Sequence, residues 1–232
     1  MRSSKRAGTT PRPDPRVQAR EDAFTEMRAH ELFGPMLRRI HPDDVDGWGV
    51  RSSALRRNAL LAVDAHGGLV FNGRAEAATC EWTWAIAHGL THLGLGHADA
   101  ARRDGRGSYA DVWRAACCLA VNRFLGSIGI PGAPDVPGGF DGAEEALAAR
   151  FTAGGIPRIT ALAGPAGRGP DLWENLHEGR RAAPAEAASV WARTFADGLT
   201  AFDGATAVGA VGRRPELTPP ARALGPGRVP PD

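Results

Sequence analysis

Five stretches of the chain carry apolar residues at helical spacing. They are residues 17–40, 81–95, 108–126, 143–152 and 184–200. Apolar side chains that recur every three or four positions are typical of a helix with one buried face. Gly34 and Pro35 interrupt the first stretch, so it predicts either one kinked helix or two short ones.

A different pattern occupies residues 58–72, where two short apolar runs flank Gly67 and Gly68. This arrangement predicts a β-hairpin. Gly- and Pro-rich segments at 129–142 and 154–170 predict loops. The sequence therefore indicates one helix-rich α+β domain with a small sheet over residues 17–205. We expect disordered tails at residues 1–16 and 206–232, where no periodicity is present.

Composition narrows the class of protein. The 232 residues are 43% hydrophobic, which is enough for a core, and the formal net charge of +2 gives no reason to expect a nucleic acid or membrane partner. No apolar run approaches the roughly 18 residues of a membrane span, and no secretory signal is recognisable. Three cysteines are too few for a disulfide framework. We expect a cytoplasmic protein, and the predominance of arginine over lysine suggests a bacterial one.

The candidate chemistry lies in the segment HGLTHLGLGH, residues 88–97. His88 and His92 are four residues apart in a predicted helix, so both imidazoles point the same way and can share one zinc ion. The surrounding segment is apolar, where an unpaired histidine is costly. The alternative is a pair of core histidines that are satisfied by the backbone and by water.

His97 is the third histidine of this segment. In a continuous helix it lies about 180° from His88 and faces away from the site. Gly94 and Gly96 indicate that the helix ends first, which allows the chain to turn His97 back toward the other two. The third histidine of the metzincin peptidases comes six residues after the second, where this chain has Ala98, so the segment is not of that type.

Residues 45–130 resemble a bacterial metallopeptidase domain that is often followed by a von Willebrand A-like domain. The resemblance rests on the order of three motifs, LLAVDAHGGLVFN, AHGLTHLGLGH and DVWRAACCLAVNRFL. It implies a zincin-like fold, in which the histidine helix packs on a second helix. It also aligns His88, His92 and His97 with the histidines of the HExxHxxxxH motif. Trp113 and Asn122 match the tryptophan and the asparagine of the family's second helix.

The chain departs from that family at two positions. Gly89 stands where the family has the catalytic glutamate, and Cys118 stands where the second helix has an aspartate. Glycine cannot take a proton from a metal-bound water, and loss of a general base typically costs about 10²–10⁴-fold in rate. Asp99 is a weak substitute candidate for the missing base. A Gly89→Glu variant is expected to recover some hydrolysis if the metal keeps an open position.

Cys118 has two interpretations. Its thiolate is a good zinc ligand, so His88, His92, His97 and Cys118 can form a closed structural Zn²⁺ site. Alternatively, Cys118 is a small buried hydrophobic residue. Two functions remain open: a zinc-binding, metallopeptidase-like protein with impaired or absent peptidase activity, and a non-enzymatic binding or scaffold protein of the same fold. Through the resemblance, the second implies a protein partner of an ATPase and von Willebrand A type.

Overall fold

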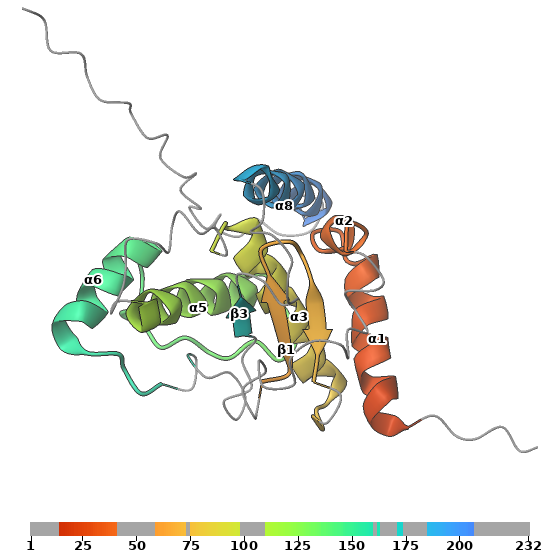
Figure 1. Ribbon diagram of the computed structural model, residues 1–232, viewed down its shortest axis with the longest axis horizontal. Coiled ribbons are helices and arrows are strands. Elements are labelled where there is room, and N and C mark those ends of the chain that lie inside the picture. Colours follow the sequence, from red (N-terminus) through yellow and green to blue (C-terminus); the bar gives the residue numbers. More distant parts are fainter. Residues whose placement is uncertain are drawn as a thin grey trace, which may run out of the picture.

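The computed structural model describes residues 14–40, 59–72, 75–97, 110–159, 162, 171–173 and 185–206. These residues form a helix-rich α+β fold, as predicted. The helices are α1 (Pro15–Ala29), α2 (Gly34–Leu37), α3 (Thr79–Gly94), α5 (Ala110–Ser127), α6 (Glu144–Gly154) and α8 (Ala185–Thr206). The strands are β1 (Leu61–Asp64), β2 (Leu69–Phe71) and β3 (Asp171–Trp173). Figure 1 shows α3 beside the sheet, with α1 and α2 to one side and α5 and α6 to the other.

The first predicted helical stretch forms two helices. Pro15 occupies the first turn of α1, and the Asp14 carboxylate accepts a hydrogen bond from the backbone N–H of Arg16 at 2.9 Å. The helix therefore begins two residues before the expected boundary. A Cβ atom on Gly34 would lie 2.5 Å from the carbonyl oxygen of Arg28, so the close turn into α2 requires glycine.

The predicted hairpin is confirmed. Strand β1 pairs with β2 in antiparallel register, with Leu61 opposite Phe71 and Val63 opposite Leu69. The carboxylate of Asp64 closes the turn by accepting the backbone N–H groups of His66 and Gly68. Strand β3, which the apolar pattern does not predict, pairs with β1 in parallel and makes β1 the central strand of three.

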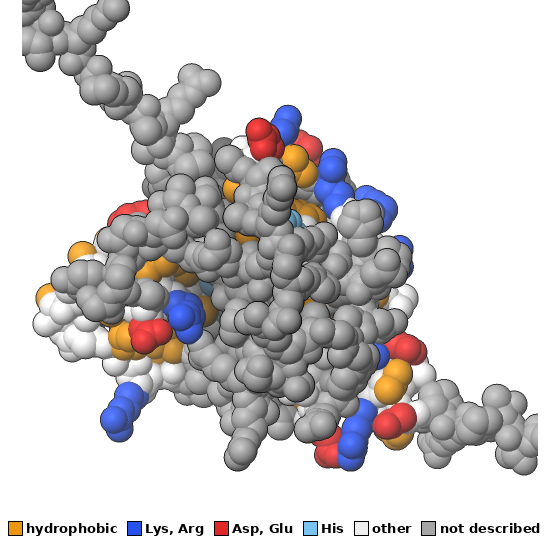
Figure 2. Space-filling model, viewed as in Figure 1, with side chains coloured by type: hydrophobic (Ala, Val, Ile, Leu, Met, Phe, Trp, Pro, Cys, Tyr) orange, Lys and Arg blue, Asp and Glu red, His pale blue; other side chains and the backbone are white. Residues whose placement is uncertain are grey.

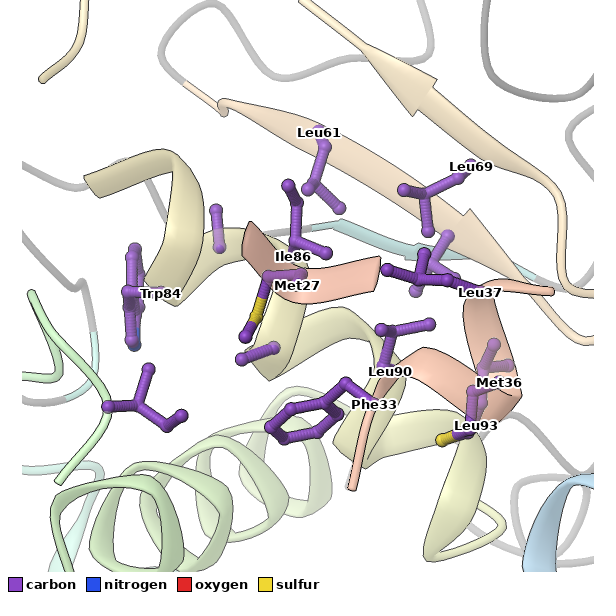
Figure 3. Packing of buried hydrophobic residues seen from close by; sticks show 14 of the residues in the cluster. Met27, Phe33, Met36, Leu37, Leu61, Leu69, Trp84, Ile86, Leu90 and Leu93 are labelled. Carbon is purple, nitrogen blue, oxygen red and sulfur yellow. The ribbon is translucent and has the colours of Figure 1, made fainter. Parts of the chain in front are cut away.

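Helix α3 is the centre of the structure. Every residue from Trp82 to Gly94 is buried, because α1, α5, α8 and β1 all pack against this helix. Figure 3 shows Ile86, Leu90 and Leu93 of α3 among apolar side chains from the hairpin and from α1 and α2. A helix that is enclosed on all sides must satisfy its polar side chains inside the protein.

A second, smaller core lies between α5 and α6. It contains Trp113, Ala116, Cys117, Leu119, Leu147, Ala148 and Phe151. On the face in Figure 2, side chains of both charge signs lie intermingled on the described helices. Within the described part of the chain, no helix is long and apolar enough to cross a membrane. Most of the two expected tails (residues 1–13 of 1–16 and residues 207–232 of 206–232) and the candidate base Asp99 lie outside the described residues.

Candidate metal centre

The structure brings His88 and His92 together on the face of α3 that packs against α5. Each residue is 1% exposed, and the two Nε2 atoms lie 2.9 Å apart. The pair is therefore oriented as the four-residue spacing predicts, with one nitrogen of each ring directed at a common point.

Asn122 of α5 fixes the protonation of His88. Its Oδ1 atom lies 2.8 Å from His88 Nδ1 and accepts a hydrogen bond from the Trp84 indole N–H at 2.9 Å. Because an amide oxygen only accepts, His88 must carry its proton on Nδ1. The neutral imidazole then has a free lone pair on Nε2, which is the atom that faces His92.

Cys118 adds sulfur to the pair. It lies one turn before Asn122 on α5, so the two residues share a helix face. The Sγ atom of Cys118 lies 3.6 Å from His92 Nε2, and the potential ligand atoms of His88, His92 and Cys118 all lie within 4.8 Å of one another. Cys117 instead lies in the smaller core beside Trp113. The two adjacent cysteines therefore differ in their surroundings, as their positions around the helix predict.

His97 lies next to this cluster and contacts the Nδ1 atom of His92. Helix α3 ends in a Schellman motif, in which the N–H of His97 bonds to the carbonyl of His92 at 2.9 Å and Gly96 has a φ of +69°. This cap turns His97 back, as Gly94 and Gly96 predict. Its Nδ1 atom lies 2.8 Å from His92 Nδ1, whereas His92 Nε2 is the atom that faces His88 and Cys118. His97 thus contacts the potential ligand His92 through the ring nitrogen that does not face the other ligand atoms.

Burial keeps the two central histidines neutral. Desolvation lowers the pKa of His88 to about 3, against the opposing effect of its bond to Asn122, and the nearby His97 lowers it further. Desolvation also places the pKa of His92 well below its usual value, helped by His88 and His97. Both rings therefore have lone pairs available for a metal near neutral pH, without loss of a proton.

The described ligand cluster holds two histidines and a cysteine, and it contains no carboxylate that could act as a base. Gly89 faces the sheet: a Cβ atom there would lie 3.3 Å from Leu61 Cδ1 and 3.5 Å from Val63 Cγ1. Glu81 accepts a hydrogen bond from the backbone N–H of Ala78 and caps the start of α3, two turns from the histidines.

One residue near the site was not predicted from the sequence. Glu144, in the first turn of α6, has its Oε1 atom 3.3 Å from His97 Nε2. It lies 47 positions after His97 in the chain, and neither helical spacing nor the motif resemblance connects the two. Trp113, which the resemblance places on the second helix, lies edge-on to His97, with ring centroids 6.3 Å apart.

Comparisons with known protein families, with curated proteins and with solved structures find no match to this chain. The chemistry of the site is therefore argued from its own geometry.

Proposed function

We propose that this chain is a zinc-binding protein with a zincin-like domain, in which His88, His92 and Cys118 hold the ion. The observation that carries the proposal is the approach of two buried Nε2 atoms to 2.9 Å, with Asn122 directing a lone pair of His88 into the gap. Such an arrangement is costly without something between the two nitrogens, and either a proton or a metal ion can fill that place.

The ligand set fits zinc. Imidazole nitrogen and thiolate sulfur together favour Zn²⁺ over the hard cations Mg²⁺ and Ca²⁺. Tetrahedral zinc with bonds of about 2.0–2.3 Å separates its ligand atoms by roughly 3.3–3.6 Å. The separation of 3.6 Å between nitrogen and sulfur falls in this range, and all three ligand atoms lie within 4.8 Å of one another. The 2.9 Å between the two nitrogens is a hydrogen-bond distance, so the rings must move slightly apart to admit the ion.

Three protein ligands leave a fourth position for water or another molecule, unlike the closed set that includes His97. A bound zinc ion supplies Lewis acidity at such a position. The peptidase mechanism also needs a base, and the place of that base is taken by Gly89, packed against β1. Peptidase activity is therefore impaired or absent, and a non-enzymatic role in binding a protein or peptide partner is the second candidate.

The decisive experiment measures metal in the purified protein. Wild-type protein should contain about one zinc per chain, and the His88→Ala/His92→Ala variant should contain none. His66→Ala, which removes a histidine from the hairpin turn, is the matched control and should keep the metal. Circular dichroism of each variant separates loss of a ligand from loss of the fold.

Two outcomes overturn parts of this proposal. Folded wild-type protein that contains no zinc after supplementation rules out the metal site. Strong cleavage of an unstructured protein substrate, abolished by a chelator, rules out the impaired peptidase.

A further inference from the structure

We propose that His97 and Glu144 act as a positioning pair behind the metal centre, and that His97 is not itself a zinc ligand. The pair orients His92 through its Nδ1 atom and fixes which of the two ring nitrogens faces the ion. This inference rests on the proposed zinc site and assigns a role to two residues outside it.

The contacts form a continuous line from the cluster to α6. His92 directs Nε2 at His88 and Cys118, while its Nδ1 lies 2.8 Å from Nδ1 of His97. The other nitrogen of His97 lies 3.3 Å from the Glu144 carboxylate. The His97 side chain is fully buried and that of Glu144 is 19% exposed, so the line runs from the interior to the surface.

When zinc is bound, the positions of the protons allow every contact in this line to be a hydrogen bond. With zinc on His92 Nε2, the proton of the neutral ring is on Nδ1 and is donated to His97 Nδ1. His97 then carries its own proton on Nε2 and donates it to the Glu144 carboxylate. Every contact has one donor and one acceptor, and no ring carries an additional proton.

Without metal, the same line of contacts is mismatched as long as all three rings are neutral. His88 Nε2 is an acceptor because Asn122 holds the proton on Nδ1, so His92 must donate from Nε2 and accept at Nδ1. His97 must then donate from Nδ1, and its contact with the Glu144 carboxylate is satisfied only if the ring takes up a second proton on Nε2. With neutral rings the pair is thus matched to the zinc-bound state, as expected of residues that support a metal ligand.

Helix α5 also fixes the position of Glu144. Arg123 follows Asn122 and donates hydrogen bonds at 2.7 Å to the carbonyl oxygens of Phe140 and Gly142. These carbonyls directly precede α6, so Arg123 holds the start of that helix against α5. Helix α5 therefore contributes to the site in three ways. Cys118 supplies the thiol, Asn122 bonds to His88, and Arg123 holds the segment that leads to Glu144.

The test compares zinc affinity across four variants, measured by competition with a chromogenic chelator. His97→Phe keeps a ring of similar size and removes both hydrogen bonds, while Glu144→Ala removes the final acceptor. Each should weaken zinc binding about 10–100-fold, the usual effect of losing an outer hydrogen-bond partner of a ligand. Glu144→Gln keeps an acceptor oxygen and should restore most of the affinity. Glu145→Gln removes a charge from the same first turn of α6 and should leave the affinity unchanged.

Cobalt substitution and X-ray absorption at the zinc edge distinguish a positioning role from direct ligation. For the positioning role, His97→Phe keeps the thiolate-to-cobalt band and the same number of nitrogen scatterers. Loss of one nitrogen scatterer in His97→Phe, or unchanged affinity in both His97→Phe and Glu144→Ala, overturns the inference alone. Wild-type protein that binds no zinc overturns the proposed function and the inference together.

Discussion

Asn122 Oδ1 lies 2.8 Å from His88 Nδ1 and accepts the indole N–H of Trp84 at the same time. This single acceptor determines which nitrogen of His88 is free, and all three residues are buried. Helices α3 and α5 are thus joined by a polar contact that also prepares a ligand. The asparagine matters to the site although its side chain is not among the potential ligands.

We expect Asn122→Leu to weaken zinc binding by about 10–100-fold and to lower stability by about 1–3 kcal/mol. The first effect follows from a misoriented His88 and the second from buried donors left without an acceptor. Trp84→Phe is the matched control: it removes the indole donor but keeps the bond to His88, so zinc affinity should be retained. Chelator competition and thermal melts measure the two effects, and equal zinc affinity in Asn122→Leu and wild type would count against the role of Asn122.

Replacing the two adjacent cysteines separately should give opposite results. Cys118→Ala should weaken zinc binding, reduce the stabilisation by added zinc, and remove the sulfur scatterer near 2.3 Å from the X-ray absorption spectrum. Cys117→Ala removes atoms from the smaller core, so it should lower the melting temperature while zinc affinity stays unchanged. A zinc shell of nitrogen and oxygen alone in the wild type would show that Cys118 only fills space.

The sequence predicts the helices and hairpin well because their patterns are local. The spacing of His88 and His92 fixes their shared direction, and the two glycines predict the turn at His97. Local spacing does not predict contacts between segments that are far apart in the sequence. Glu144 meets His97, and β3 pairs with β1, through the packing of whole elements. The buried state of Gly89 against Leu61 also depends on how the hairpin meets α3, which spacing along one helix does not specify.

Acid should destabilise the metal-free protein. The pKa of His88 falls from 6.5 to about 3 on folding, and that of His92 falls well below 6.5, so the unfolded chain binds protons that the folded chain does not. Stability is therefore fully present above pH 6.5 and is lost as the pH falls below it, at up to about 1.4 kcal/mol per pH unit for each histidine. Urea unfolding of chelator-treated protein between pH 7 and pH 4.5 measures this slope. A slope no steeper than that of a His88→Leu/His92→Leu variant would show that other groups control the acid response.

Gly89 provides the last test, because a glutamate introduced at this position would complete the HExxH pattern and could supply the base that the proposed site lacks. The structure argues against success. A Cβ atom at position 89 would meet Leu61 at 3.3 Å within the closed contact between α3 and β1. Gly89→Ala should be neutral or lower stability by up to about 2 kcal/mol, since overpacking opposes the gain in helix propensity.

Gly89→Glu should be far more harmful, because it places a carboxylate between Leu61 and Val63 in the apolar interior. We expect it to unfold the domain or to leave it without hydrolytic activity. Gly126→Ala is the matched control: it lies in α5 with open space around it and should stabilise the protein by about 0.5–1 kcal/mol. Urea unfolding and cleavage of an unstructured substrate measure the two properties. A folded, zinc-loaded Gly89→Glu protein that cleaves peptides would mean that the sheet accommodates the new side chain, and that Gly89 is what keeps the wild-type chain from acting as a peptidase.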